Sequence, residues 1–325
     1  MRALVQPRFG DPAEVLSVQE VPDPEPGPGQ VLVRVLLSPI HNHDLWTARG
    51  SYGFKPEMPA RAGTEAVGVV ERLGDGVDHL QVGQRVATGG TFGAWAELIV
   101  APAAALVPVP DGMADEAAAQ LVSMPFSAIA LLDFLGLSEG DWCVQNAANG
   151  AVGRLVAQLA RARGVHVLGL VRRAEGVDEL AEHGIRDVVA TDDDAWRDRV
   201  REIVGDAPLV AGVDSVGGAA AGDVVSLLAE DGVLVVFGAM ASPTLEIASG
   251  DVIFKQVVVK GFWGSKVFAA MDRDKRSRLM GELADGLASG ALTLPVERVY
   301  ALDEIADAVR ANQAPGRRGK VLLRP

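Results

Sequence analysis

The residues best suited to chemistry lie in a short turn that joins an apolar strand to an amphipathic helix. The expected strand covers residues 141–147, and the turn Ala147-Ala148-Asn149-Gly150-Ala151-Val152-Gly153 opens the helix. Apolar side chains then recur at i, i+3, i+4 and i+7 over residues 152–159, which predicts one apolar stripe packed on a sheet. The free N–H groups and the positive end of such a helix bind phosphate groups.

The turn has the pattern A-x-x-G-x-x-G, and a second expected strand follows at residues 166–171. Ala147 would make the sharp turn, Gly150 would let the backbone approach a pyrophosphate, and Gly153 would permit close helix packing. The alternative is a turn with a purely structural role, in which Asn146 and Asn149 only help to form the turn. Strand, turn, helix and strand together favour dinucleotide binding. The predicted cofactor-binding residues of the turn are Asn146, Asn149, Gly150, Ala151, Val152 and Gly153.

Two arginines at the end of the second strand indicate which dinucleotide binds. An acidic residue at this position takes the ribose 2′-hydroxyl of NAD, whereas an arginine accommodates the 2′-phosphate of NADP. The strand here runs into Arg172 and Arg173, and the first acid, Glu175, comes after them. A solvated pair of charges is the alternative. The pattern therefore predicts NADPH.

Length, charge and cysteine content narrow the class of protein. With 325 residues, of which 49% are hydrophobic and 22% charged, we expect two domains with an ample core. The net charge of −13 argues against general affinity for nucleic acid or an anionic membrane. The single cysteine, Cys143, excludes an internal disulfide and a multi-cysteine zinc site. The first residues lack the apolar run of a signal peptide, so we expect a cytoplasmic protein.

The rest of the chain supplies the elements that must position the turn. Residues 1–110 contain short apolar runs separated by Gly, Pro and Asp, which predicts a small irregular barrel or sandwich. From residue 113 strands alternate with helices, which predicts a doubly wound parallel sheet. We expect an α/β protein with a β-rich domain at 1–112, a dinucleotide-binding domain at 113–262 and a last segment at 263–325 whose helices and strands need not belong to the parallel sheet.

This order of parts resembles the medium-chain dehydrogenase/reductase superfamily over essentially the whole chain. Its motifs here are Gly63-Thr64-Glu65-Ala66 with Gly68, Val82-Gly83-Gln84-Arg85-Val86, the turn described above and Gly316-Arg317-Arg318-Gly319-Lys320-Val321. The resemblance implies that the N- and C-terminal segments build one GroES-like catalytic domain. It also implies that substrate and nicotinamide bind in a cleft between this domain and the Rossmann domain.

Three positions separate the zinc alcohol dehydrogenases of this superfamily from its zinc-free reductases. Where the zinc enzymes carry a Cys, the His of a Gly-His-Glu motif and a further Cys, this chain has His41, Thr64 and Ser123. A two-ligand metal site on His41-Asn42-His43-Asp44, with Glu65 nearby in the family fold, can be imagined, but typical catalytic zinc takes three protein ligands. We therefore expect no metal, and we expect His41 to line the substrate pocket.

Among zinc-free members, the chain is most similar to the 2-enoyl thioester reductases, which reduce trans-2-enoyl-CoA or enoyl-acyl-carrier-protein. The resemblance rests on Asn146–Gly150, Gly50–Gly53 and Gly261–Ser265, and Phe237–Met240 also matches. The sequence departs from that family at His41-Asn42-His43-Asp44, where Asn-Pro-Ser-Asp is expected. Quinone oxidoreductases of the same superfamily are the next most similar.

The resemblance implies roles for individual residues. Tyr52 would be the catalytic proton donor, since a phenol with a pKa near ~10 stays protonated at neutral pH; a loop tyrosine that only packs is the alternative. Phe262 and Trp263 would line the substrate pocket and the nicotinamide site, with core packing as the alternative for Trp263. Lys320 would lie near the cofactor or else be a solvated charge. The remaining expected cofactor contacts are Phe237, Gly238 and Met240.

The expected reaction is the NADPH-dependent reduction of an activated carbon–carbon double bond. The first candidate substrate is a trans-2-enoyl thioester linked to CoA or to a carrier protein, with hydride added to the β-carbon and Tyr52 polarising the carbonyl. The rivals are an NADPH:quinone oxidoreductase, a zinc-type alcohol dehydrogenase and a non-catalytic NADPH-binding protein. The resemblance also implies a homodimer joined edge to edge through the cofactor-domain sheets.

Overall fold

The computed structural model describes residues 1–325 and divides them into two compact units. Unit 1 comprises residues 1–124 and 294–325, and unit 2 comprises residues 125–293. The sequence patterns place the boundaries after residues 112 and 262, whereas the chain returns to unit 1 only at residue 294. Neither unit contains a helix that combines the length and apolarity of a transmembrane span.

Two helices that follow the parallel sheet account for the later boundary. Helix α10 covers Gly264–Ala269 and helix α11 covers Arg273–Ala288. Asp133 of unit 2 forms ion pairs with both Lys275 and Arg278 of α11. Both helices therefore belong with unit 2, although the sequence suggested that the return begins at residue 263.

Unit 1 contains two sheets. The first has the order β2-β1-β4 and the second the order β15-β16-β3-β5-β6-β8, with β7 paired to β3. The strands are β1 (Arg2–Gln6), β2 (Ser17–Glu20), β3 (Gln30–Pro39), β4 (Ala60–Arg61), β5 (Glu65–Leu73), β6 (Arg85–Gly89), β7 (Leu98–Pro102), β8 (Leu106–Pro108), β15 (Val296–Ala301) and β16 (Lys320–Arg324). The helices are α1 (Pro12–Val15), α2 (Asn42–Arg49), α3 (Asp115–Ala118) and α12 (Ile305–Gln313), with 3-10 turns η1 (Ala103–Ala105) and η2 (Leu302–Glu304).

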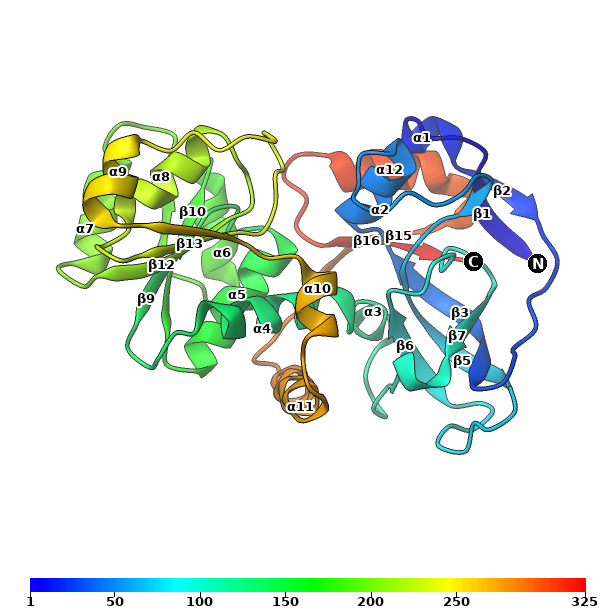
Figure 1. Ribbon diagram of the computed structural model, residues 1–325. Coiled ribbons are helices and arrows are strands. Elements are labelled where there is room, and N and C mark those ends of the chain that lie inside the picture. The colour runs from blue at the N-terminus through cyan, green and yellow to red at the C-terminus, as the bar shows by residue number, and fades with distance from the viewer. The chain divides into compact units, whose positions relative to one another are not determined.

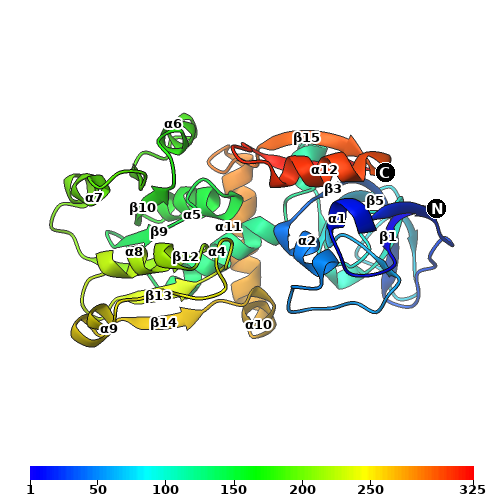
Figure 2. The same cartoon turned by 90° about the horizontal axis from the view of Figure 1, so that it is seen from above.

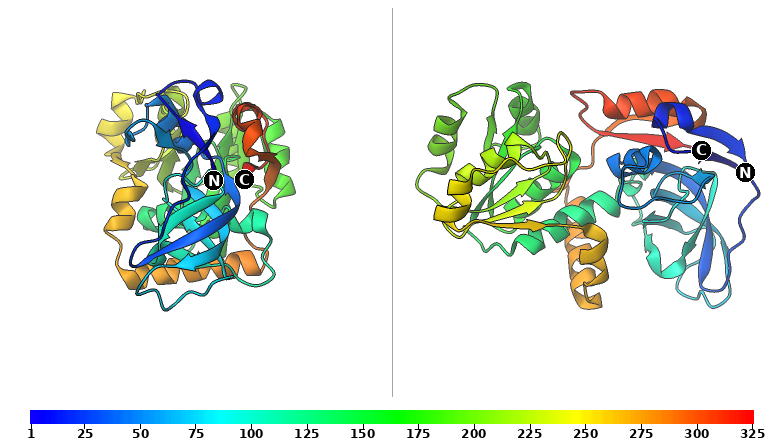
Figure 3. Two further views of the ribbon diagram at one scale, coloured as in Figure 1. Left: turned by 90° about the vertical axis from the view of Figure 1, so that its right-hand side faces the viewer. Right: turned by 45° about the horizontal axis from the view of Figure 1, so that its top comes forward.

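The last strand, β16, completes unit 1 by pairing antiparallel with β3. It is the red strand in Figure 3, and its register sets Leu323 opposite Ser38. The Ile40 N–H donates to the Val321 carbonyl (3.0 Å), and the apolar side chains of β16 are completely buried. Burial of apolar surface therefore holds the end of the chain in place. The pairing sets Lys320 beside the residues that lead from β3 into α2.

Unit 2 is a six-stranded parallel sheet with helices packed on it (Figure 1). The strand order is β11-β10-β9-β12-β13-β14, and Figure 2 shows the strands from β10 to β14 following one another across the unit. The strands are β9 (Trp142–Gln145), β10 (His166–Val171), β11 (Val188–Ala190), β12 (Leu209–Asp214), β13 (Val233–Val236) and β14 (Val258–Gly261). The remaining helices are α4 (Ser123–Leu135), α5 (Ala151–Ala162), α6 (Glu175–Glu182), α7 (Trp196–Val204), α8 (Ala219–Leu227) and α9 (Ser249–Lys255).

This strand order reverses its direction between β9 and β12. Strands β10 and β11 follow β9 on one side, and β12, β13 and β14 follow on the other. Open α/β sheets bind ligands at the carboxyl ends of the strands where such a reversal occurs. The predicted fold class, a β-rich part joined to a doubly wound parallel sheet, is confirmed.

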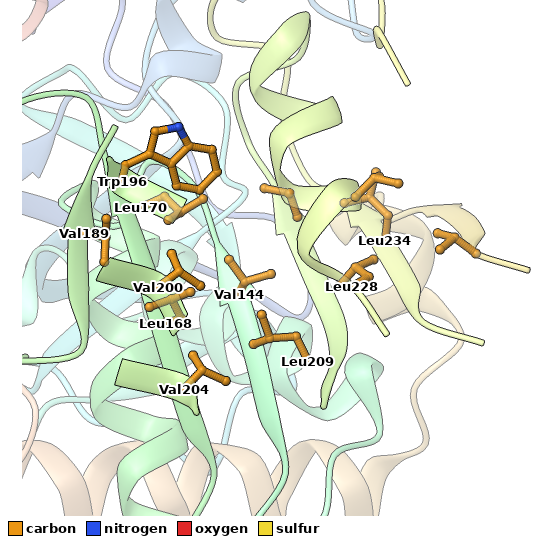
Figure 4. Close-up of a cluster of buried hydrophobic side chains, with 13 residues drawn as sticks. Val144, Leu168, Leu170, Val189, Trp196, Val200, Val204, Leu209, Leu228 and Leu234 are labelled. Atoms are coloured by element: carbon orange, nitrogen blue, oxygen red, sulfur yellow. The ribbon is translucent and has the colours of Figure 1, made fainter. Parts of the chain in front are cut away.

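The main core of unit 2 packs between the sheet and helices α7 and α8. Val144 and Leu168 come from the adjacent strands β9 and β10, Leu234 from β13, and Trp196 and Val200 from α7 (Figure 4). Full burial of one such side chain contributes about 1.5–3 kcal/mol. This core fixes the strands whose ends carry the candidate cofactor site.

Candidate active site

The glycine turn of unit 2 brings the chain sharply from β9 into α5. Ala147 has a φ of 49°, in the left-handed region, which makes the reversal. A Cβ on Gly153 would lie 2.8 Å from the carbonyl oxygens of Ala147 and Ala148, so only glycine allows this close approach. The Gln145 side chain fastens the turn by donating from Nε2 to the Gly153 carbonyl (2.8 Å).

Helix α5 begins directly after this turn. Its N-cap residue, Gly150, is exposed, and the predicted phosphate-binding residues Asn149, Ala151 and Val152 are partly exposed beside it. The first turn of the helix contains no acidic side chain, so the positive end of the helix dipole stays available to an anion. The residues present therefore fit the pyrophosphate of a dinucleotide.

Asn146 holds the scaffold of this site together. Its buried side chain donates from Nδ2 to Asp214 Oδ1 and accepts the Ser215 backbone N–H (2.7 Å). Asp214 Oδ1 also accepts the backbone N–H groups of Val216 and Gly217 (both 3.1 Å). The amide thus ties the end of β9 to the loop after β12, and a direct bond from Asn146 to the cofactor stays a prediction.

The loop after β13 joins the same network. The N–H groups of Phe237 and Met240 donate to the carbonyl oxygens of Asp214 (2.7 Å) and Ser215 (3.1 Å). A Cβ on Gly238 would lie 2.9 Å from the Ser215 carbonyl oxygen, which explains the glycine. The predicted cofactor residues Phe237, Gly238 and Met240 therefore lie at the carboxyl ends of the parallel strands, the same end of the sheet that carries the glycine turn.

The two aromatic residues after β14 have different surroundings. Phe262 is buried, with its ring centroid 5.6 Å from that of Phe237 and 5.5 Å from that of Phe134. Trp263 caps α10 and is 62% exposed. Of these two aromatic residues, both predicted to line the pocket, only Trp263 is open to a ligand, while Phe262 packs against Phe237 from the inside.

Both arginines that the sequence assigns to cofactor selection are exposed at the end of β10. Arg173 makes a long ion pair with Glu175, with its Nε 4.0 Å from Oε2. Guanidinium groups bind phosphate through paired, charge-assisted hydrogen bonds. Arg172 and Arg173 therefore fit a ribose 2′-phosphate.

In unit 1, His41 lies at the centre of a buried row of polar groups. Its Nδ1 is 2.9 Å from Lys320 Nζ, and its Nε2 is 2.6 Å from Glu65 Oε2. Because an ammonium only donates, Nδ1 accepts, so Nε2 carries the proton and donates to Glu65. Glu65 Oε1 accepts the backbone N–H groups of Val122 (2.8 Å) and Ser123 (2.7 Å).

Burial sets the charge states of this row. It raises the pKa of Glu65 to about 7, although the N–H groups of Ser123 and Val122 and the Lys320 charge oppose the shift. Burial, reinforced by the Lys320 ammonium, holds the pKa of His41 well below its ordinary value of 6.5. His41 is therefore neutral at physiological pH, with its proton on Nε2.

A second chain of hydrogen bonds runs from His43 through Thr64 to Asp44. The Thr64 hydroxyl donates to Asp44 Oδ1 (2.7 Å) and lies 2.8 Å from His43 Nε2. Since the one hydroxyl proton goes to Asp44, Thr64 accepts from the His43 N–H. Asp44 Oδ2 accepts the His41 backbone N–H (2.9 Å) and so caps the start of α2.

Tyr52 lies against this second chain. Its ring centroid is 5.8 Å from that of His43, and the two rings are tilted by 31°. The phenol is half-buried, and burial, helped by the negative charge of Asp44, raises the pKa of Tyr52 above its ordinary value of 10. The hydroxyl therefore stays protonated across neutral pH and can donate a hydrogen bond.

Two predicted residues of unit 1 face the interior. His41, expected to line the substrate pocket, is 0% exposed and stacks beneath His43. Lys320, expected near the cofactor or in solvent, is buried, and its Nζ also lies 3.3 Å from the Ile40 carbonyl oxygen. The pocket role of His41 and the cofactor role of Lys320 stay predictions.

The sequence did not reveal that His43, Thr64 and Asp44 form one chain of hydrogen bonds against Tyr52. The available signal was the departure at residues 41–44, which placed two histidines before an aspartate. The structure contains no group of three or more His, Cys, Asp or Glu side chains that could hold a metal ion. The imagined metal ligands His41 and His43 instead bond to Glu65 and Thr64.

Two family patterns match the chain. Residues 27–111 match the alcohol dehydrogenase GroES-like domain, which lies within unit 1. Residues 151–280 match the zinc-binding dehydrogenase family, which lies within unit 2. The expectation of a GroES-like part followed by a Rossmann part is confirmed.

Individual proteins match over nearly the whole chain. The mitochondrial enoyl-[acyl-carrier-protein] reductase of Homo sapiens is 31% identical over 330 residues, which cover 99% of this chain and 88% of that protein. A quinone oxidoreductase from Pseudomonas syringae has a TM-score of 0.88 and 29% identity, covering 100% of this chain and 99% of its own. A mycobacterial protein solved in complex with NADPH has a TM-score of 0.87 and 30% identity, covering 100% of both chains.

Proposed function

We propose a specific reaction for this chain, which belongs to the medium-chain dehydrogenase/reductase superfamily and is an oxidoreductase. The reaction is the NADPH-dependent reduction of a trans-2-enoyl thioester linked to CoA or to a carrier protein. The observation that carries the proposal is the protonated phenol of Tyr52, held on a polar network in a chain that also has a dinucleotide cradle.

The cofactor would bind to unit 2 through groups already in place. The N–H groups at the start of α5 would hold the pyrophosphate, and Arg172 and Arg173 would hold the 2′-phosphate. When bound, NADPH supplies a hydride from its nicotinamide. The mycobacterial relative solved with NADPH supports this choice of cofactor.

Tyr52 would stabilise the charge that develops on the substrate. As a hydride reaches the β-carbon, negative charge moves onto the thioester carbonyl oxygen, and a hydrogen bond from the Tyr52 hydroxyl lowers the energy of that state. The raised pKa keeps this proton in place throughout the neutral range. A proton must then be added to the α-carbon to complete the reduction, and the protonated phenol of Tyr52 would supply it. General acid catalysis of this kind contributes about 10²–10⁴-fold in rate.

A quinone reductase is the second candidate, and a surface feature of unit 1 favours it. Phe54 and Phe92 are both exposed, and their ring centroids lie 4.5 Å apart. Phe54 comes two residues after Tyr52 in the sequence. Exposed aromatic rings suit a planar aromatic acceptor. The quinone oxidoreductase of Pseudomonas syringae supports this reading, and the human enoyl reductase supports the first.

Turnover assays separate the two candidates. NADPH oxidation is followed with crotonyl-CoA and with a small quinone, in the wild type, in Tyr52→Phe and in the control Tyr300→Phe. Tyr300 is buried in the apolar core of unit 1, so its loss of a hydroxyl reports on stability alone. We expect thioester turnover to fall about 10²–10⁴-fold only in Tyr52→Phe. Turnover with quinone alone, unchanged in Tyr52→Phe, would reject the enoyl reductase.

We also propose that the partner of this chain is a second copy of itself. Strand β14 is the outermost strand of its sheet, so one edge of its backbone has no neighbouring strand. Exposed apolar side chains surround this edge on α9 and β14: Val252, Ile253, Phe254, Val258 and Val259. Unpaired edge strands with apolar side chains tend to pair with another chain. Two copies of β14, related by a two-fold axis, would form backbone hydrogen bonds with each other.

Light scattering coupled to gel filtration tests this pairing. We expect a dimer in the wild type and a monomer after Phe254→Asp combined with Val259→Asp, since buried unpaired carboxylates would oppose the interface. The control Phe92→Asp changes an exposed aromatic side chain of unit 1 and should leave the dimer intact. A monomeric wild type at assay concentrations would contradict the proposal.

A further inference from the structure

Three aromatic rings of unit 1 lie in succession: the His41 ring stacks on the His43 ring, and the Tyr52 ring is tilted by 31° against the His43 ring. The His41 and His43 ring centroids lie 5.0 Å apart at an interplanar angle of 14°, and the Tyr52 ring follows 5.8 Å beyond His43. His41 is completely buried, His43 is partly exposed and Tyr52 is half-buried. The stack therefore connects the buried polar row to the candidate acid.

The middle ring is fixed by two independent contacts. Stacking on His41 fixes the plane of the His43 ring, and the hydrogen bond from Nε2 to Thr64 fixes its rotation within that plane. Thr64 is itself held by its bond to Asp44. The His41 ring below is held at both nitrogens, by Lys320 and by Glu65.

Tyr52, in contrast, lies on an irregular segment, directly after Ser51, whose backbone N–H donates to the Trp46 carbonyl oxygen (3.0 Å). Residues 51–59, between α2 and β4, contain no helix or regular strand. The adjacent Gly50 ends α2 in the left-handed conformation, with φ 75°. A phenol on such a segment needs a neighbouring surface to hold its orientation, and the His43 ring is the side-chain ring that contacts it.

We propose that His43 is the positioning residue of Tyr52, and that contact with the fixed His43 ring holds the phenol at one orientation. This inference rests on the proposed function, in which Tyr52 donates to the substrate carbonyl oxygen. A misplacement of a catalytic group by about 1 Å costs on the order of 10²-fold in rate. His43 thus acts through Tyr52, and its loss leaves cofactor binding in unit 2 untouched.

A double-mutant cycle on kcat with crotonyl-CoA tests the inference. The variants are His43→Ala, Tyr52→Phe and the combination, with thermal unfolding and NADPH affinity measured for each. We expect His43→Ala to lower kcat by about 10-fold to 100-fold in the wild-type background. In the Tyr52→Phe background we expect almost no further loss, because no hydroxyl remains to be positioned.

Two matched variants separate the ring from its hydrogen bond and cover the case in which His43→Ala fails to fold. His43→Phe keeps a ring for the stack and should restore most of kcat, whereas His43→Asn keeps an amide donor without a ring and should not. Equal losses from His43→Ala in both backgrounds, or restoration by Asn but not Phe, would overturn the inference. Unchanged turnover in Tyr52→Phe would instead overturn the proposed function, whatever His43 does.

Discussion

The two units build their candidate sites from different parts of the chain's chemistry. In unit 2 the cofactor site consists largely of backbone N–H groups, and Asn146 and Asp214 hold the loops that present them. In unit 1 the site consists of side chains, and His41, Glu65 and Lys320 satisfy one another in the interior. In unit 2, where backbone segments approach each other closely, a substitution that adds atoms should damage the site. In unit 1, where buried side chains bond to one another, a substitution that removes atoms should damage it.

Removal of one buried charge should have the largest effect. Lys320→Met would leave His41 Nδ1 without its donor and Glu65 without the nearby cation. Loss of one partner from a buried ionic group costs about 3–5 kcal/mol. We expect unit 1 to lose stability by this amount, measured as faster hydrogen exchange in peptides that cover residues 38–44 and 320–325. Lys266→Met changes an exposed lysine and serves as the control.

Unchanged exchange in unit 1 of Lys320→Met would contradict this expectation. Faster exchange in unit 1 with unchanged NADPH affinity would show that the two sites are energetically separate.

In the candidate cofactor site of unit 2, the exposed arginines are the side chains expected to contact the cofactor directly. The double variant Arg172→Ser with Arg173→Ser would delete the proposed contacts to the 2′-phosphate. Hydrogen bonds to charged groups contribute about 1.5–3 kcal/mol, so NADPH affinity should fall about 10-fold to 150-fold. NADH affinity, which involves no 2′-phosphate, should change little. Equal losses for both cofactors, measured by titration of protein fluorescence, would contradict the assignment.

Addition of atoms is the sharper test of the cradle. A Cβ on Gly153 would lie 2.8 Å from two carbonyl oxygens and 2.9 Å from the Ala148 Cα, all of them backbone atoms that cannot rotate away. Overpacking of this kind costs about 1–3 kcal/mol, so Gly153→Ala should weaken NADPH binding several-fold or more. Gly281→Ala on the exposed face of α11, where a Cβ meets nothing within 4 Å, is the matched control. It should be neutral or slightly stabilising.

The dependence of stability on pH should be the smallest effect, because two groups of unit 1 oppose each other. Glu65 has a pKa of about 7 in the fold against an ordinary 4.5, so its contribution is full below 4.5 and is lost as pH rises towards 7. The depressed pKa of His41 acts in the other direction, with stability present above 6.5 and lost as pH falls. The wild type should therefore change little in the interval between 4.5 and 6.5.

His41→Asn would expose the effect of Glu65. We expect unit 1 of this variant to lose stability steadily as the pH rises from about 5 to about 7, by at most about 1.4 kcal/mol per pH unit. Hydrogen exchange of residues 60–70, corrected for the intrinsic effect of pH, measures this slope. A slope equal to that of the wild type would show that the two groups do not titrate as described.

The same contrast explains how much the sequence could predict. The cradle lies within residues 145–153, so its glycines could be read from local spacing, and the parallel sheet followed from alternating strands and helices. The local sequence around Asn146 did not show that its side chain bonds to Asp214, because the two residues are 68 positions apart in the sequence. Nor could the pattern separate neighbours such as the buried Phe262 and the exposed Trp263.

The site in unit 1 depends on pairs that are far apart along the chain. Glu65 lies 24 residues from His41, and Lys320 lies 279 residues from it. Sequence periodicity gives the type of an element, whereas these contacts follow from how β5 and β16 align on β3. Tyr52 could be singled out through its resemblance to a known loop, but its support by His43 required the structure.

The pairing of β16 with β3 also sets an order of events during synthesis. All of unit 2, residues 125–293, leaves the ribosome before the strand that completes unit 1. Because domains fold as units while the chain is made, the parallel sheet can form around its own core while β3 still lacks β16. Only the final residues deliver Lys320 to His41. A chain that ends a few residues early would carry the cofactor cradle without the lysine beneath its ring stack.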